Sequence, residues 1–299
     1  MTARPARLAT MIAAIALAGS IAGCAGIGSA SDEDGKPKVV AAFYPLVFVA
    51  EQVGGPEVTV TNLTTPGVEP HDLELTPRQV AAIAKADLVV YLKGFQPAVD
   101  EAVEQNASRT LEVSSVVPLT GTPGSGTGRD PHFWLDPTKL AQLVDPVSEQ
   151  LAAVDAAHAD AFAVRAKALK ARLAELDAEY RSGLASCART EIVTAHAAFG
   201  YLAERYQLEQ IPIAGVSPDQ EPAPHRIRQI QELVQQRGIT TIFFERLLSA
   251  DLADTIARDT GASTALLDPI EGITDTATND YFTVMRANLA ALRKALSCT

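Results

Sequence analysis

Short apolar runs alternate along this chain with longer stretches in which apolar residues recur every three or four positions. The segment VVAAFYPLVFVAEQVGG predicts a strand over 39–43 and a helix that begins at Tyr44 and ends at Gly54. An alternating strand at VTVTNLT, a helix at TPRQVAAIAKA with Thr76 as its N-cap and a buried strand at DLVVYLKG continue the series. Strands that alternate with helices favour an α/β fold with a mostly parallel sheet.

A second series of strands and helices follows one unusually long amphipathic segment. Residues 157–184 place apolar side chains at three- and four-residue intervals, which predicts one helix roughly 42 Å long. Beyond it, EIVTAH, QIPIAGV, TTIFFE and STALLDP have the pattern of strands, each followed by a helical segment. We therefore expect two β/α sandwich lobes joined by one long backbone helix, with an N-terminal lobe over 38–156, the linking helix over 157–185 and a C-terminal lobe over 186–299.

The beginning of the chain has the pattern of a bacterial export signal. Two arginines precede a short apolar run over 8–17, too short to span a bilayer permanently, and the lipobox IAGC follows, ending at Cys24. We expect residues 1–23 to be a lipoprotein signal peptide, Cys24 to carry the lipid and residues 24–37 to form a flexible tether. The mature protein is then expected outside the cell, lipid-anchored to the outer face of the membrane. An ordinary secretory signal with an incidental cysteine is the alternative.

The charge balance excludes one class of partner. The chain has 25 Lys and Arg against 36 Asp and Glu. Loss of the signal removes Arg4 and Arg7 but no acid, which leaves 23 basic residues against 36 acidic ones and a net charge of −13. An acidic chain without a basic run is not expected to bind nucleic acid, and it cannot use a polybasic segment to hold anionic lipid.

Two cysteines remain beyond the lipobox, Cys187 and Cys298. Outside the cytoplasm an even pair is expected to be oxidised, so we predict a Cys187–Cys298 disulfide that ties the C-terminal end to the start of the second lobe. Two buried thiols are the alternative.

Three of the five histidines stand in separate loop-like patches: His71 in VEPHDLELTP, His132 in DPHFWLDP and His196 in VTAHAAFGYLAERY. A fourth patch, LLDPIEG, offers Asp268. Each patch follows the carboxyl end of a predicted strand, which is where parallel α/β sheets bind ligands. If the two lobes face each other, all four side chains converge in the cleft between them. Three imidazoles and one carboxylate are a tetrahedral ligand set typical of zinc.

Each candidate ligand also has an ordinary structural explanation. His71, between a proline and an aspartate, fits a turn, and His196 fits a core histidine at a strand end. His132 fits a half-buried loop residue hydrogen-bonded to Asp130 or Asp136, although the same acids are able to orient a metal-bound ring. Asp268, before a proline, fits a turn or a helix cap.

Other polar residues near these patches are expected to support the site or to lie apart from it. We expect His158 and His225 on solvated helix surfaces. Glu69 and Glu245 are candidates to approach the cleft without binding the metal themselves, and Arg246 is a candidate to pair with one of them.

Taken together, these patches resemble the metal-specific solute-binding proteins of ABC transporters, the zinc- and manganese-binding class called cluster A-I. The resemblance covers nearly the whole chain and includes the lipobox and, in family order, GVEPHDLELTP, DPHFWLDP, TAHAAFGYLAERY, GVSPDQEPAP, IFFE and LLDPIEG. It implies two β/α lobes joined by a long helix, with the metal between them. It also implies that His71, His132, His196 and Asp268 hold that metal, the last directly or through water.

The resemblance implies a function as well. We expect a monomeric lipoprotein, not an enzyme, that captures Zn²⁺ and delivers it to the permease and ATPase of an ABC transporter. Manganese members of the family typically have Glu where His196 stands, and a third imidazole favours zinc because manganese prefers oxygen ligands. Uptake of manganese or iron by the same mechanism is the alternative.

One departure from the family and two distant alternatives complete the interpretation. Many zinc members carry a long loop rich in His and acids before the second ligand, whereas GTPGSGTG contains neither. A surface adhesin with structural zinc is one alternative. A zinc hydrolase is the other; it needs an open coordination position and a base such as Glu69, and the chain has no HExxH motif.

Overall fold

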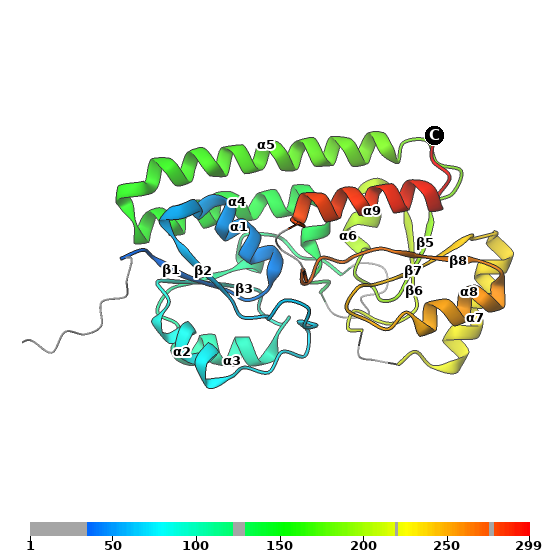
Figure 1. Cartoon of the computed structure of the whole chain (residues 1–299), viewed down its shortest axis with the longest axis horizontal. Helices are drawn as coiled ribbons and strands as arrows, with labels where there is room; N and C mark the ends of the chain where they lie inside the picture. The colour runs from blue at the N-terminus through cyan, green and yellow to red at the C-terminus, as the bar shows by residue number, and fades with distance from the viewer. Residues whose placement is uncertain (1–34, 122–128, 219–220, 275–277) are drawn as a thin grey trace, which may run out of the picture. The chain divides into compact units, whose positions relative to one another are not determined.

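The computed structural model of the protein describes residues 35–121, 129–218, 221–274 and 278–299. The predicted signal peptide, the lipidation site Cys24 and most of the predicted tether lie outside these residues. Lys36–Thr299 form one compact unit, whose described residues are drawn in colour in Figure 1.

The N-terminal half contains a four-stranded parallel sheet in the order β2-β1-β3-β4. Helices connect the strands, as the alternation of patterns predicts. Thr76 caps α2 in a reciprocal capping box with Gln79, and α1 ends where Gly55 adopts a φ of +62°. The strands are β1 (Lys38–Ala41), β2 (Thr59–Asn62), β3 (Leu88–Tyr91) and β4 (Thr110–Glu112), and the helices are α1 (Tyr44–Gly54), α2 (Pro77–Lys85) and α3 (Pro97–Asn106).

The C-terminal half repeats this arrangement with a parallel sheet in the order β6-β5-β7-β8. In each half, the strand that comes first in the sequence, β1 or β5, lies second in the sheet. The strand that follows it in the sequence lies on one side of it, and the next strand lies on the other side. The strands are β5 (Glu191–Thr194), β6 (Glu209–Pro212), β7 (Thr241–Phe244) and β8 (Ser263–Leu266), and the helices are α6 (Gly200–Tyr206), α7 (Pro224–Arg237), α8 (Asp251–Thr260) and α9 (Tyr281–Ala295). The predicted α/β fold with two lobes is confirmed.

Two long helices connect the halves. Helix α4 (Pro137–Val154) packs along α5 (Ala159–Gly183), and Figure 1 shows α5 running over both halves of the molecule. The long helix is 25 residues, slightly shorter than the predicted 157–184, because Ala156–His158 forms a turn of 3-10 helix before it. Its length is about 37 Å. The predicted lobe boundaries at either end of this helix stay predictions.

Helix α5 is fixed to both halves by hydrogen bonds near its two ends. Near its start, the Arg165 guanidinium donates to the carbonyl oxygens of Val53 and Gly54, each at 2.7 Å. Near its end, the Tyr180 hydroxyl donates to the carbonyl oxygen of Met285 in α9 at 2.6 Å. The long helix is therefore a rigid connection rather than a free linker.

A continuous apolar core also runs between the two halves. Phe48 of α1 packs against both Tyr281 and Phe282 of α9, with ring centroids 5.2 and 5.6 Å apart. Tyr180 of α5 stacks on Tyr206, which ends α6, at 5.0 Å. A second, smaller cluster fills the space between the C-terminal sheet and α7 and α8. Aromatic packing of this kind holds the two sheets in a fixed relation.

The predicted Cys187–Cys298 disulfide is present and closes a segment of 111 residues. The two cysteines also pair as an isolated antiparallel bridge, and the backbone N–H of Thr299 donates to the carbonyl of Ser186 at 2.9 Å. The end of the chain is thereby fastened beside the end of α5.

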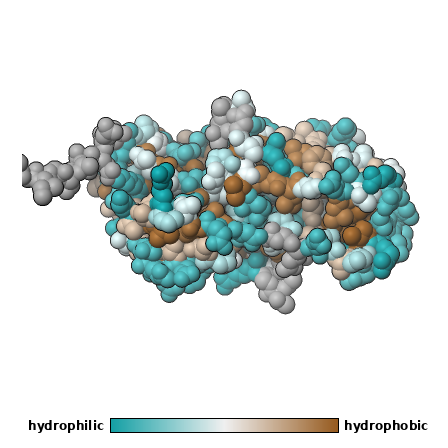
Figure 2. All heavy atoms as spheres, turned by 60° about the horizontal axis from the view of Figure 1, so that its bottom comes forward, coloured by the Kyte–Doolittle hydropathy of each residue, from teal (hydrophilic) through white to brown (hydrophobic). Residues whose placement is uncertain are grey.

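On the face drawn in Figure 2, hydrophilic residues surround smaller hydrophobic patches. Among the described residues, the exposed large hydrophobic side chains are Val68 and Val164. No helix in the described part of the chain is both long and apolar enough to cross a membrane.

Candidate metal centre

Four loops that follow strands meet between the two sheets. His71 lies between β2 and α2, and His132 lies between β4 and α4. His196 follows β5 by two residues, and Glu271 lies between β8 and α9. Because both sheets are parallel, loops at the carboxyl ends of their strands gather at one edge of each sheet. Two ligand candidates therefore come from each half.

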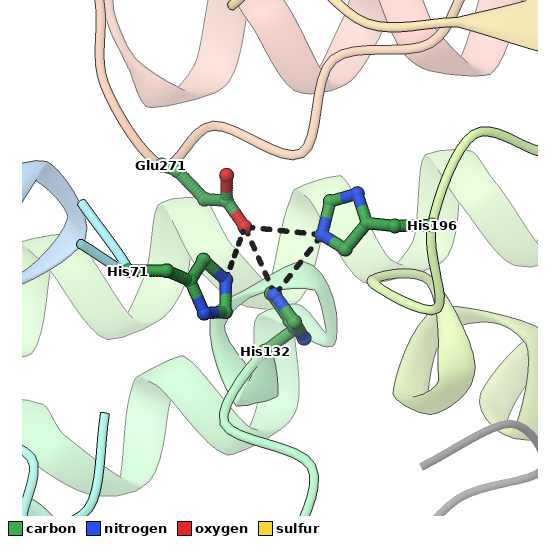
Figure 3. A group of neighbouring side chains, drawn as sticks. All are labelled: His71, His132, His196 and Glu271. Atoms are coloured by element: carbon green, nitrogen blue, oxygen red, sulfur yellow. Dashed lines mark hydrogen bonds and ion pairs between the residues drawn. The ribbon is translucent and has the colours of Figure 1, made fainter. Parts of the chain in front are cut away.

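Figure 3 shows the three imidazoles and the Glu271 carboxylate turned towards a common point. The carboxylate oxygen Oε1 lies 2.9 Å from Nε2 of His132, 3.3 Å from Nε2 of His196 and 3.4 Å from Nε2 of His71. One ligand atom from each of these four residues lies within 4.8 Å of all the others. Three nitrogens and one oxygen at this spacing match the donor set of a tetrahedral zinc ion.

His132 is buried and held from behind by an acid of its own loop. The Asp130 carboxylate oxygen Oδ1 accepts both the backbone N–H of His132 at 2.9 Å and its ring Nδ1 at 2.8 Å. This arrangement leaves Nε2 to face the centre. A carboxylate behind a histidine ring is the usual way to fix the orientation of a metal-binding imidazole. Of the two acids predicted to orient this ring, Asp130 does so, whereas Asp136 caps α4 by accepting from the N–H of Thr138.

His196 has a matching partner in the other half. Glu245, directly after β7, lies 2.8 Å from Nδ1 of His196 and accepts its backbone N–H at 3.2 Å. Both side chains are almost fully buried. Glu245 is therefore one of the acids predicted to approach the cleft, and it orients a ring rather than facing the centre.

His71 is held by its loop and by an aromatic edge. Its backbone N–H donates to the Glu69 carboxylate at 2.9 Å, which bends the loop back on itself. Its ring packs edge-on against Phe95 with centroids 4.6 Å apart. The His71 side chain is 8 % exposed, whereas those of His132 and His196 are 0 % exposed, so His71 is the most accessible of the three rings.

Burial and mutual contact shift the pKa values of these groups in opposite directions. Burial lowers the pKa of His71, and contact with Glu271 only partly opposes this. Burial acts to lower the pKa of His132 as well, but hydrogen bonds with Asp130 and Glu271 outweigh it and raise that pKa.

The strongest shifts concern His196 and Glu271. Burial disfavours a charged His196, but the charges of Glu245 and Glu271 hold its pKa well above the ordinary value. Burial likewise disfavours an ionised Glu271, but the charge of His196 and hydrogen bonds from the three histidines hold its pKa well below the ordinary value. These opposite shifts favour a protonated imidazole beside an ionised Glu271 carboxylate.

The prediction that Asp268 is the fourth residue facing the histidines is wrong. Its carboxylate oxygen Oδ2 accepts from Nε of Arg246 at 2.9 Å, and Oδ1 accepts the backbone N–H of Ile270 at 2.9 Å. Both oxygens are thus engaged in shaping the loop. Glu271, three residues later, reaches the centre instead. Arg246 accordingly pairs with Asp268 and not with Glu69 or Glu245.

Glu271 stands in the same patch, LLDPIEG, but the sequence pattern favours Asp268. An acid directly at a strand end is a common ligand position, and this made Asp268 the natural choice. The Asp-Pro pair, however, is itself a signal for a turn. In a turn the carboxylate of the aspartate often binds the backbone of the turn, so a residue after the turn is the one that faces the centre. A longer carboxylate just after that turn is the feature that identifies Glu271.

The other two histidines lie apart from the centre. His158 stands beside Asp155 with its side chain half exposed, and His225 is exposed in the first turn of α7. Both positions agree with the surface locations predicted for them. The GTPGSGTG segment, predicted to lack a metal-collecting role, lies almost entirely outside the described residues.

The sequence and the fold both match proteins of zinc uptake. The family model "Zinc-uptake complex component A periplasmic" (ZnuA) matches residues 39–295. The high-affinity zinc uptake system protein ZnuA of Bacillus subtilis (strain 168) is 31% identical over 288 residues, which cover 90% of each chain. The zinc-binding lipoprotein AdcA of Streptococcus pneumoniae is 33% identical over 280 residues, 87% of this chain and 56% of AdcA. The chain thus spans about half the length of AdcA.

Solved structures lead to the same family. The laminin-binding protein Lmb of Streptococcus agalactiae, described as a bifunctional protein with adhesin and metal-transporting activity, has a TM-score of 0.81 and 32% identity over 87% of this chain and 99% of Lmb. The Zn(II)-bound ZnuA-like domain of Streptococcus pneumoniae AdcA has a TM-score of 0.77 and 33% identity over 88% of this chain and 99% of that domain.

The family consists of transport binding proteins, which agrees with the prediction that the chain is not an enzyme. The matched region contains both sheets, the long helix and all four residues of the centre. This protein belongs to the ZnuA family, the metal-binding solute-binding proteins of zinc-uptake ABC transporters.

Proposed function

We propose that this protein captures Zn²⁺ outside the cell membrane and delivers it to the permease of an ABC transporter for uptake. The observation that carries the proposal is the group of three imidazole nitrogens, one from each histidine, and one Glu271 oxygen within 4.8 Å of one another. Loops of both halves contribute, so a single ion there would contact both sheets. Its ligands are His71, His132, His196 and Glu271.

The donor set supports zinc as the transported ion. Imidazole nitrogens suit zinc, whereas manganese prefers sites richer in oxygen ligands. Four protein ligands also complete a tetrahedral shell and leave no position for a reactive water, which suits a carrier better than a hydrolase. Manganese or iron uptake by the same site is the alternative that the metal test below distinguishes.

The rigid connection between the halves favours release by local movement. Helix α5 and the shared aromatic core hold the two sheets together, so a wide hinge opening would break much apolar packing. We propose that the permease displaces the loop that carries Glu271, which would leave three ligands in place of four. Loss of one charged ligand weakens a zinc site without any rearrangement of the two sheets.

The location and organisation of the mature protein form part of the same proposal. Lipidation at Cys24 would anchor it to the outer face of the membrane, close to the permease and its ATPase, with 24–37 as the tether. The lobes would span 38–156 and 186–299, with 157–185 between them. Of the two activities described for Lmb, we propose only metal transport for this chain, because the four-residue centre accounts for that activity.

The experiment that tests the proposal has two parts. Metal analysis and competition titration of the purified protein lacking the lipid should show one tightly bound Zn²⁺ per chain and weaker binding of Mn²⁺. Deletion of the gene should impair growth in chelated medium, with rescue by added zinc. Mn²⁺ binding as tight as that of Zn²⁺ would overturn the choice of metal, and unchanged growth and zinc content would overturn the transport function.

A further inference from the structure

The loop that presents Glu271 begins with an ion pair that the metal centre itself does not use. We propose that Asp268 and Arg246 are positioning residues, which hold Glu271 in place as the fourth ligand and couple it to His196. This inference rests on the proposed function, since it concerns the same zinc site.

The first observation is the turn between Asp268 and Glu271. Oδ1 of Asp268 accepts the backbone N–H of Ile270 at 2.9 Å, and Ile270 adopts a φ of +58° although it is β-branched and fully buried. Such a residue rarely enters the left-handed region, because its side chain crowds the backbone there. The surrounding contacts must therefore impose this conformation. Glu271 follows it directly, so the turn sets where its carboxylate points.

The second observation is that the start of the turn is anchored by buried groups. The side-chain amide of Asn288 in α9 makes two hydrogen bonds to the backbone of Asp268, accepting its N–H at 2.9 Å and donating to its carbonyl oxygen at 2.7 Å. Trp134 donates its indole N–H to the carbonyl of Pro269 at 2.7 Å. The backbone before Ile270 is therefore fixed, and the Asp268 carboxylate shapes the turn that follows through its hydrogen bond with Ile270.

The third observation is the position of Arg246 in the sequence. It directly follows Glu245, whose carboxylate orients the ring of His196. Nε of Arg246 donates to Oδ2 of Asp268 at 2.9 Å. Two consecutive residues after β7 thus hold two different ligands, one by direct contact and the other through the turn.

The difference in burial indicates what each partner does. The Asp268 side chain is 6 % exposed, whereas that of Arg246 is 43 % exposed. A nearly buried carboxylate without its cation would be strongly disfavoured, and its charge lies only three residues from the ionised Glu271. Arg246 therefore compensates the charge of the carboxylate that holds the turn, and its exposure lets it be replaced without opening the core.

The test is a double-mutant cycle on zinc affinity, measured by competition with a chromophoric chelator. We expect Asp268→Ala to weaken Zn²⁺ binding about tenfold to hundredfold in the otherwise unchanged protein, as replacement of groups that support metal ligands does. In a Glu271→Ala background the same change should cost less than about threefold, because the ligand that Asp268 positions is already gone. Equal losses in both backgrounds would overturn the inference.

A second variant avoids any effect of Asp268→Ala on folding. Arg246→Gln removes the cation from an exposed position and leaves the hydrogen bond from Ile270 in place, so it should fold and show the same coupling to Glu271. The visible absorption spectrum of the Co²⁺-loaded protein, which reports the ligand set, should shift in both variants towards that of Glu271→Ala. An unchanged spectrum and affinity in Arg246→Gln would also overturn the inference.

The matched control is Glu179→Gln. Glu179 of α5 binds Arg286 of α9 through two contacts of 2.8 Å, so it is another carboxylate–guanidinium pair that involves the helix carrying Asn288. Its loss should leave zinc affinity and the Co²⁺ spectrum unchanged. The two proposals are separable, because failure of the unchanged protein to bind zinc contradicts the proposed function, whereas additive losses in a zinc-binding protein contradict only the positioning role.

Discussion

Oδ1 of Asp130 lies 2.8 Å from Nδ1 of His132, and Nε2 of the same ring lies 2.9 Å from Glu271. The imidazole is thus held between two carboxylates from opposite halves of the molecule. With Nδ1 engaged by Asp130, Nε2 is the atom left to bind a metal. In the other half, Glu245 engages Nδ1 of His196 in the same way and leaves Nε2 to face the centre.

Asp130→Ala should therefore lower zinc affinity about tenfold to hundredfold while the protein still folds, because the ring loses the group that orients it and makes it more basic. Competition titration measures the loss. Asp136→Ala is the control from the same loop. Its carboxylate caps α4, so it should lower the free energy of unfolding by about 1 kcal/mol and leave zinc affinity unchanged. An equal loss of affinity in the two variants would contradict the role of Asp130.

His196→Glu should shift metal preference from zinc towards manganese, because it replaces a nitrogen donor by a carboxylate. The ratio of Zn²⁺ to Mn²⁺ affinity should fall by about tenfold or more. Glu245, now beside another acid, would oppose the change, so the double variant with Glu245→Gln should show the shift more clearly. His225→Glu, at an exposed position, should leave the ratio as it was. A preference that stays the same in the double variant would mean that residue 196 does not select the metal.

Zinc affinity should fall as pH falls, starting above the ordinary histidine pKa of about 6.5. The pKa values of His132 and His196 are raised in the free site, so zinc must displace protons from them, and each displaced proton costs about tenfold in affinity per pH unit. Glu271 stays ionised throughout, because its pKa is lowered. Titration in weakly buffered solution should detect proton release near pH 7. Zinc uptake without proton release would contradict this account.

The stability of the zinc-free protein should follow pH in the opposite sense. A raised folded-state pKa means that His196 contributes stability fully at pH below its unfolded-state value of about 6.5, and this contribution is lost as pH rises through the folded-state pKa. Denaturant unfolding of the metal-free protein at several pH values measures the trend. Addition of zinc should remove it, since the ion then takes the place of the proton.

Removal of the disulfide should destabilise the protein without changing the metal site. Cys298→Ser opens a closed segment of 111 residues, so the free energy of unfolding should fall by about 2–5 kcal/mol. The double variant with Cys187→Ser should show a similar loss, which separates the crosslink from the effect of one unpaired thiol. Zinc affinity should be unchanged in both. A marked loss of zinc affinity would mean that the Cys187–Cys298 disulfide also affects the loops that carry the metal ligands.

Structural features that depend on a few neighbouring residues could be predicted from the sequence. Thr76 followed by Gln79 marks the start of α2, because each side chain satisfies the backbone of the other. The alternation of strand and helix patterns predicted both parallel sheets, and the two cysteines left after the lipobox predicted the crosslink. In each case the physical cause lies within a few residues or in a pairing with one solution.

Features that depend on three-dimensional neighbours were not predictable in the same way. Asp268 and Glu271 both stand in one short patch, and the choice between them depends on Arg246, which lies in another strand–loop unit. Asp130 lies two residues before His132 and Asp136 four residues after it. Only the course of the loop decides which of the two reaches the ring. Hydrophobic pattern carries no information about such partners.

The aromatic contacts of Phe48 with Tyr281 and Phe282 have a calorimetric consequence. Because the C-terminal helix contributes to the core of the N-terminal half, neither sheet is able to melt while the other stays intact. Heating should give a single cooperative transition for Lys36–Thr299, not the two that separate domains would give. Zinc binds only the folded form, so it should raise the temperature of this single transition. The melting temperature of the whole molecule then reports how much zinc is bound at the four side chains.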